Sequence, residues 1–335
     1  MIEKPKKVRL GIIGCGIIAN ERHVPALLRL KDRFTVSALC NRTRPKAEAM
    51  AEKLGLDSEN IWLDWRRMLD EAPVDAVLIC LPIEMNCEVG SAAASAGKHV
   101  LCEKPLGRNP EELDAIADLG AQHGVTYMCA ENYHYEPTFA KAAHLVQKDA
   151  IGQVTVISWN LLRFMELDNK YNKTAWRVDH HYPGGYLLDG GVHYIHVIRM
   201  MAGRICSVAA STRSIEPGLG KIDTAFALLT HENGVLSSLN MSWHTRDPEN
   251  HPLCIFGTQG SIMVDDRSLV LIDEQGNKSD VPYLGEDSFY LELIDFHRAV
   301  ALGEEPLISI ESAAHDVEVI LAMLESAEKG RPVNL

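Results

Sequence analysis

Near its amino terminus the chain reads Val8-Arg9-Leu10-Gly11-Ile12-Ile13, and Gly14-Cys15-Gly16-Ile17-Ile18-Ala19 follows directly. The first six residues are typical of a buried strand, and an apolar helical periodicity continues beyond the second six. A G-x-G-x-x-A loop between a strand and a helix indicates that the pyrophosphate of a dinucleotide binds along the loop. Gly14 permits the tight turn, Gly16 lets the backbone approach the phosphates, and Ala19 lets the helix pack on the strand. A glycine-rich turn without a ligand is the simpler alternative, and the flanking strand and helix argue against it.

Strands and helices alternate along the first third of the chain. Beyond the opening strand, the pattern predicts strands over residues 34–40, 74–81, 98–102 and 125–130, with intervening helices over residues 44–54, 84–96 and 110–123. Such alternation predicts an α/β fold with a doubly wound parallel sheet, a Rossmann dinucleotide-binding domain. We place this domain at residues 1–130.

The remaining residues, 131–335, follow a different pattern. A helix over residues 136–148 precedes strands with few helices between them, predicted over residues 154–162, 206–214, 225–230, 235–243, 253–256 and 261–264, before closing helices over residues 288–301 and 310–329. This pattern predicts an α+β domain with a largely antiparallel, open sheet. One face of the sheet is free if helices cover only the other face. Because a free apolar face is an interaction surface, we expect a homodimer or a homotetramer.

A second motif, Glu103-Lys104-Pro105, stands at the carboxyl end of the strand over residues 98–102. Open parallel sheets bind ligands at these ends, so Lys104 is expected where a cofactor and a substrate meet. Leu81 and Pro82 close the preceding strand at the same edge, and we expect them to contact the cofactor. The proline fixes the chain direction after Lys104, and a cis bond is possible there. A solvated surface lysine is the alternative for this motif taken alone.

A third motif joins Asp189 and His193 after the glycine pair Gly184-Gly185. If a helix begins near these glycines, the carboxylate and the imidazole are four residues apart on one helix face. Such a pair can fix the histidine tautomer and prepare it for proton transfer near neutral pH. A capping aspartate and a hydrogen-bonded core histidine form the alternative, which this segment alone favours.

The three motifs, in this order and at this spacing, resemble the glucose-fructose oxidoreductase/inositol dehydrogenase/MocA (Gfo/Idh/MocA) family over nearly the whole chain. The resemblance implies that Lys104 lies at the nicotinamide and hydrogen-bonds the reacting oxygen. It implies that His193 is the general acid/base, with Asp189 as its partner and as a substrate contact.

The resemblance also extends to segments outside the three motifs. It implies that Glu131-Asn132-Tyr133 links the two domains, and we expect Asn132 at the cofactor and Tyr133 at the substrate. Trp176-Arg177 resembles a pair that lies near the substrate in this family. Glu103, beside Lys104, is expected to contact the cofactor.

The implied reaction is a hydride transfer between a nicotinamide cofactor and a secondary alcohol or ketone of a sugar, a sugar derivative or a cyclitol. His193 takes the hydroxyl proton, and Lys104 stabilises the charge that develops on the oxygen. Two other functions stay open: an NAD-dependent glycosidase of the same fold, which oxidises the sugar transiently without net redox change, and a non-catalytic, ligand-sensing regulator. The intact set of Lys104, Asp189 and His193 argues against the regulator, and nothing in the sequence excludes the glycosidase.

The end of the second strand bears on the choice of cofactor. An acidic residue there would select NAD by binding the adenosine ribose, and this chain has Asn41 instead. Arg42 and Arg44 follow, and a guanidinium group matches the oxygens of a 2′-phosphate. The alternative is that both arginines are solvated residues at the start of a helix. The sequence therefore favours NADP(H), and NAD(H) is possible.

Composition restricts the partners. The 335 residues carry a net charge of −13, which argues against nucleic acid and anionic membranes as partners. The eight cysteines lack C-x-x-C pairing, and most lie in apolar runs, so we expect free thiols in a reducing compartment, the cytoplasm. We expect no metal, because the D-x-x-x-H-x-x-H spacing of Asp189, His193 and His196 matches no zinc site.

Overall fold

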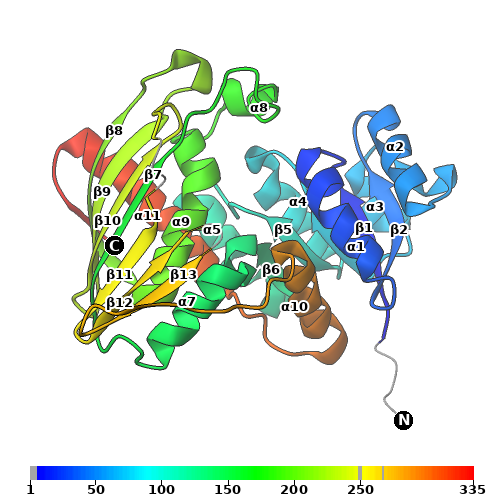
Figure 1. Ribbon diagram of the computed structural model, residues 1–335. Coiled ribbons are helices and arrows are strands. Elements are labelled where there is room, and N and C mark those ends of the chain that lie inside the picture. Colours follow the sequence, from blue (N-terminus) through cyan, green and yellow to red (C-terminus); the bar gives the residue numbers. More distant parts are fainter. Residues whose placement is uncertain (1–5, 248–250, 266–267) are drawn as a thin grey trace, which may run out of the picture. The chain divides into compact units, whose positions relative to one another are not determined.

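The computed structural model describes residues 6–247, 251–265 and 268–335. The chain forms two compact units, each built on its own sheet (Figure 1). One unit comprises the chain up to Asn132 together with Glu286–Ala314, and the other comprises Tyr133–Gly285 together with His315–Leu335. Within the described ranges, no helix combines the length and the apolar character that crossing a membrane requires.

The first unit contains a six-stranded sheet in the order β3-β2-β1-β4-β5-β6, in which all neighbouring strands are parallel. Its strands are β1 (Val8–Ile13), β2 (Phe34–Cys40), β3 (Ile61–Trp62), β4 (Ala76–Ile79), β5 (His99–Glu103) and β6 (Tyr127–Ala130). The predicted doubly wound sheet is confirmed. Strand order reverses between β1 and β4, and ligands of such sheets bind at the carboxyl ends beside that reversal.

Helices connect these strands, as the alternating pattern predicts. They are a π-helical turn η1 (Ala19–His23) that continues into α1 (Val24–Arg29), then α2 (Arg44–Leu54), the 3₁₀ turn η2 (Ser58–Asn60), α3 (Trp65–Glu71), α4 (Ile83–Ser95), α5 (Pro110–Ala117) and α6 (Leu119–His123). The helix predicted over residues 110–123 is thus divided in two. Strands β1, β4 and β6 are almost wholly buried, because helices cover both faces of a doubly wound sheet.

Helix α10 (Ser288–Leu302) belongs to the first unit, although the sequence analysis assigned residues 131–335 to the second domain. It packs on α1, η1 and β1. The ring of Phe296 stacks on Phe34 with 6.5 Å between centroids, and His297 Nε2 lies 3.0 Å from the Lys6 carbonyl oxygen. The apolar face of α10 predicts burial, but it does not say which sheet buries it.

The second unit contains a nine-stranded sheet in the order β14-β13-β12-β11-β7-β10-β9-β8-β15. Among the described strand pairs of this nine-stranded sheet, only β7–β10 is parallel, so the prediction of a largely antiparallel sheet is confirmed. The strands are β7 (Val154–Leu162), β8 (Ile205–Arg213), β9 (Thr224–His231), β10 (Leu236–Ser242), β11 (Leu253–Gly257), β12 (Gly260–Val264), β13 (Leu269–Asp273), β14 (Lys278–Asp280) and β15 (Val333–Asn334). The last three lie where no strand was predicted.

The helices of this unit are η3 (Asn132–Tyr135), α7 (Pro137–Gln147), α8 (Ala175–Val178), α9 (Tyr186–Ala202), η4 (Pro217–Leu219) and α11 (Ile310–Lys329). Of these, η3 and α11 have their first residues, Asn132 and residues 310–314, in the first unit. Helix α9 packs on β7, β9 and β10 and so covers one face of the sheet. The opposite face of these strands and of β11 carries apolar side chains that are 42% to 66% exposed, namely Val156, Phe226, Leu228, Leu236 and Phe256. Two polar pairs lie on the same face, where Ser238 donates to Ser158 and Asn240 donates to Asn160.

Candidate active site

The glycine-rich loop follows β1 at the point where the strand order reverses. Gly14 has φ +102°, and a Cβ there would lie 2.2 Å from the Cys80 carbonyl oxygen, so both conformation and packing require glycine. A Cβ at Gly16 would meet no described atom within 4 Å. The fold itself therefore does not require glycine at Gly16, and the open space beside it suits a group from outside the chain. Since the helix that includes Ile17 and Ile18 starts directly afterwards, this space fits the pyrophosphate of a dinucleotide.

Asn41 links this loop to the turn after β2. Its Oδ1 accepts a hydrogen bond from the backbone N–H of Cys15 at 3.1 Å, and its Nδ2 donates to the carbonyl oxygen of Thr43 at 2.8 Å. A carboxylate at this position could accept the first bond but could not donate the second. Of the two arginines, Arg44 pairs with Glu48 at 2.9 Å, whereas Arg42 is exposed and has no ion pair in the described part of the chain.

Lys104 is half-buried in the turn that follows β5, and the Lys104–Pro105 peptide is cis. The side chain of Asn86 in α4 donates from Nδ2 to the carbonyl oxygen of Glu103 at 3.0 Å and to that of Pro105 at 2.9 Å. Leu81 and Pro82 form the connection from β4 to α4 at the same edge, and Leu81 lies beside Gly14. The parallel sheet thus brings the glycine loop, Leu81, Pro82 and Lys104 to one edge.

The Glu103 carboxylate points into the protein interior. Its Oε1 lies 2.7 Å from His23 Nε2, and the residue is 7% exposed, so the Glu103 carboxylate is paired inside the unit. Ligand-type atoms of His23, Cys80 and Glu103 lie within 4.8 Å of one another, a cluster that the sequence analysis did not foresee. Two nitrogen or oxygen ligands on one tetrahedral zinc would lie about 3.3 Å apart. The 2.7 Å separation is therefore that of a hydrogen bond.

Glu292 of α10 is buried near this cluster. It is 0% exposed, and neither carboxyl oxygen has a hydrogen-bond partner in the part of the chain that is described. Burial raises the pKa of the Glu292 carboxyl well above its usual range, and the neighbouring carboxylates of Glu103 and Glu131 raise this pKa further. The folded state thus favours the protonated carboxyl.

Glu292→Gln is expected to stabilise the protein at alkaline pH. The carboxyl ionises in the unfolded chain at about pH 4.3, whereas the folded state keeps the proton, so the wild-type free energy of unfolding falls with rising pH by up to about 1.4 kcal/mol per unit until the raised folded pKa is passed. Glutamine keeps the shape and cannot ionise. The melting-temperature advantage of Glu292→Gln should therefore be absent near pH 4 and grow as the pH rises above that value, while Glu305→Gln, an exposed control, should show none. An advantage that does not change with pH would contradict this account.

Asp189 and His193 lie four residues apart on α9, as the glycine pair predicts. The Asp189 carboxylate accepts a hydrogen bond from Arg177 Nε at 2.7 Å, a partner that the sequence analysis did not assign to it. The Arg177 guanidinium lies over the rings of Trp176 at 4.0 Å and Tyr171 at 5.1 Å. The two aromatic rings therefore stabilise the position of the Arg177 guanidinium, and this guanidinium in turn binds the Asp189 carboxylate.

The imidazole of His193 is half-buried against Tyr133. The two rings stack with 4.3 Å between centroids and 15° between planes. The predicted substrate residues of the second unit therefore form two contact groups, one of Trp176, Arg177 and Asp189 and the other of Tyr133 and His193. Helix α9 joins the two groups, because it carries both Asp189 and His193. Asn132, for which we expect a cofactor contact, donates from Nδ2 to Ser288 Oγ at 3.1 Å in the first unit.

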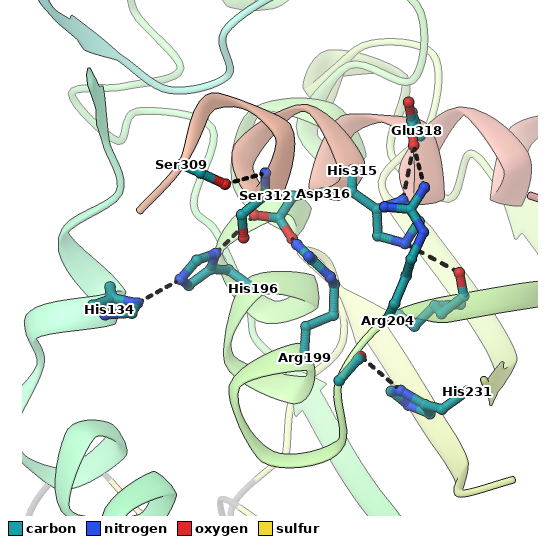
Figure 2. A network of polar contacts seen from close by, with 12 residues as sticks. His134, His196, Arg199, Arg204, His231, Ser309, Ser312, His315, Asp316 and Glu318 are labelled. Carbon is teal, nitrogen blue, oxygen red and sulfur yellow. Dashed lines mark hydrogen bonds and ion pairs between the residues drawn. The ribbon is translucent and has the colours of Figure 1, made fainter. Parts of the chain in front are cut away.

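A buried polar network holds the turn η3, which carries Tyr133. Figure 2 shows His196 between His134 and Asp316. His196 Nε2 lies 2.9 Å from His134 Nδ1, His196 Nδ1 lies 2.8 Å from Asp316 Oδ2, and Arg199 donates to the other oxygen of Asp316 at 2.5 Å. The sequence analysis considered His196 only as a metal ligand, which it rejected, and predicted none of these contacts. The segments that supply this network are up to 120 residues apart, so no local pattern could reveal it.

Comparison with known proteins adds a family and an activity class to this geometry. Residues 8–131 match the model of an oxidoreductase family with an NAD-binding Rossmann fold, GFO/IDH/MocA, and residues 139–263 match the GFO/IDH/MocA C-terminal domain. Myo-inositol 2-dehydrogenase of Thermotoga maritima is 28% identical over 98% of this chain and 98% of its own length. D-xylose 1-dehydrogenase (NADP(+)) 2 of Haloferax volcanii is 28% identical over 97% and 99%. The crystal structure of an oxidoreductase of Thermotoga maritima superimposes with a TM-score of 0.91 at 34% identity and covers 98% of both chains.

Proposed function

Because the chain belongs to the GFO/IDH/MocA family of NAD-binding oxidoreductases, we propose that it transfers a hydride between a nicotinamide cofactor and a secondary alcohol or ketone of a sugar, a sugar derivative or a cyclitol. The observation that carries the proposal is that the open glycine loop and Lys104 lie at one edge of one parallel sheet. The activities by which the inositol and xylose relatives are named support the substrate class.

In this proposal each part of the site has a separate role. The loop from Gly14 to Ala19 holds the pyrophosphate, and the bound nicotinamide supplies the hydride chemistry. Lys104 Nζ donates a hydrogen bond to the reacting oxygen and stabilises the negative charge that develops on it. His193 accepts the hydroxyl proton during oxidation and returns it during reduction. Asp189, held by Arg177, binds a substrate hydroxyl.

A panel of sugars and cyclitols tests the function. The protein is incubated with NAD(P)⁺ and myo-inositol, D-xylose or related sugars, and with nitrophenyl glycosides, while reduced nicotinamide and released sugar are measured separately. The proposal predicts that reduced nicotinamide accumulates in step with substrate consumption. Release of free sugar without net reduction would identify the glycosidase instead, and binding without either product would identify the regulator.

For the cofactor we propose NADP(H), with NAD(H) as the alternative. Arg42→Ala is expected to weaken NADPH binding about tenfold, the effect of losing one charge-assisted hydrogen bond, and to change NADH binding little. Arg44→Ala should have a smaller effect, because the Arg44 guanidinium already pairs with Glu48. Isothermal titration calorimetry gives the affinities of the wild type, Arg42→Ala and Arg44→Ala for NADPH and for NADH. Tighter binding of NAD(H) to the wild type, or an Arg42→Ala variant that binds NADPH normally, would overturn the preference.

For the assembly we propose that a second copy of the chain covers the open face of the nine-stranded sheet, giving a homodimer or a homotetramer. Its exposed apolar side chains are of the kind that protein interfaces bury. Light scattering should give a multiple of 37.1 kDa, and Leu228→Glu combined with Leu236→Glu should reduce it towards one chain. Leu284→Glu, a control at a 96% exposed leucine outside this face, should leave the mass unchanged. A wild-type mass near 37.1 kDa at micromolar concentration would refute the proposal.

None of the eight cysteines, all of which lie in the described ranges, forms a disulfide bond, and five of them are buried. Cysteines that form no disulfide support our further proposal that the protein works in a reducing compartment, the cytoplasm. Its net charge of −13 supports a small-molecule substrate rather than nucleic acid.

A further inference from the structure

We infer that Asn86 is a positioning residue for Lys104, whose side-chain amide holds the turn that carries the lysine. The inference rests on the proposed function, since it concerns the lysine that faces the reacting oxygen. It assigns to α4, a helix outside the three sequence motifs, a part in setting the geometry of the reaction.

Both hydrogen bonds of Asn86 go to the turn. Its Nδ2 lies 3.0 Å from the carbonyl oxygen of Glu103 and 2.9 Å from that of Pro105, so the two bonds hold the chain on either side of Lys104. One amide group carries two N–H donors and can serve both carbonyls at once. The residue is 0% exposed, so an apolar replacement would remove both amide donors from these two carbonyls in the interior.

Apolar packing alone does not explain why a polar asparagine stands on the buried face of α4. The other buried residues of α4 are apolar or glycine, namely Ile83, Val89, Gly90, Ala93 and Ala94. A polar side chain on that face is unfavourable unless it is hydrogen-bonded. Its Oδ1 has no hydrogen-bond partner among the residues the structure describes, so the contribution of Asn86 is its pair of donors.

The strand ladder does not extend through the turn. The pairing of β5 with β6 ends at Glu103 opposite Ala130, one residue before Lys104. The Glu103 side chain is anchored at His23, on the strand side of the turn. Asn86 reaches both sides and is therefore placed to set the direction in which Lys104 leaves the sheet. A shift of about 1 Å in a catalytic group can lower a rate by about 100-fold.

The test compares Asn86→Leu and Asn86→Ala with Val89→Ala, a buried substitution three residues further along α4 that removes apolar packing and no hydrogen bond to the turn. Hydrogen–deuterium exchange of the full chain without ligand follows the peptide over residues 102–109. Steady-state kinetics with NADP⁺ and the best substrate from the myo-inositol and D-xylose panel give kcat and KM, and calorimetry gives the cofactor Kd. Asn86→Ala provides the data if Asn86→Leu does not fold.

The inference predicts faster exchange over residues 102–109 and a kcat lowered about 10- to 100-fold in the Asn86 variants, with cofactor Kd changed less than about threefold. Val89→Ala should lose thermal stability while its exchange in this peptide and its kcat stay near the wild-type values. Exchange in the Asn86 variants no faster than in Val89→Ala would overturn the inference. A wild-type kcat in an Asn86 variant would also overturn the inference if Lys104→Ala, measured in the same assay, has a lowered kcat. If the wild type shows no redox turnover, the proposed function fails, and the exchange measurement still decides whether Asn86 holds the turn.

Discussion

Lys104→Ala is expected to lower kcat by two orders of magnitude or more, with little change in cofactor affinity. Removing one preorganised donor to an oxygen that gains negative charge typically lowers kcat by about 100- to 1,000-fold. Lys104 follows the carboxyl end of β5 directly, where a parallel sheet presents its ligands, and the turn is held from both sides by Asn86. The effect should fall on kcat, because the interaction strengthens as the charge develops.

The measurement is kcat and KM on the substrate that the sugar panel identifies, together with calorimetric titration of the cofactor. Lys31→Ala removes an exposed lysine of the same unit and serves as the matched control, with expected wild-type kinetics. Near-normal turnover by Lys104→Ala on the true substrate would remove Lys104 from the mechanism.

His193→Asn is expected to lower kcat by about 100- to 10,000-fold, the range for loss of a positioned general acid/base. Asparagine keeps a polar group on α9 but cannot take up a proton near neutral pH. The wild-type rate should therefore show a pH dependence from the imidazole that the variant lacks. Because His193 is half-buried on the ring of Tyr133, the substitution also removes a ring contact, which circular dichroism and thermal unfolding should show to be tolerated.

His144→Asn, at an exposed histidine of α7 in the same unit, is the control and should keep both the rate and its pH profile. The double variant of Lys104 and His193 gives a further measurement. If both side chains act on one substrate oxygen, the combined loss should be smaller than the product of the two single losses. A pH profile unchanged by His193→Asn would remove this histidine as the acid/base group.

Much of the architecture could be predicted because its signals are local. The glycine loop, the strand before it and the helix after it lie within about one βαβ unit, so Gly14–Ala19 could be recognised without knowing any distant contact. The glycine pair before Tyr186 likewise predicts the helix that places Asp189 and His193 on one face. The strands β13, β14 and β15 were missed because two are very short, β14 is fully exposed, and none has strong apolar alternation.

The sequence by itself determined the two kinds of sheet and the motifs at their ends, because periodicity and turn residues act over a few positions. Only the tertiary structure decided which residues support those motifs. Asn86 reaches carbonyls 17 and 19 residues away, His196 meets Asp316 after 120 residues, and α10 returns to the first sheet. Such partners meet because buried polar groups must find donors and acceptors wherever packing brings them, and packing is a property of the whole fold.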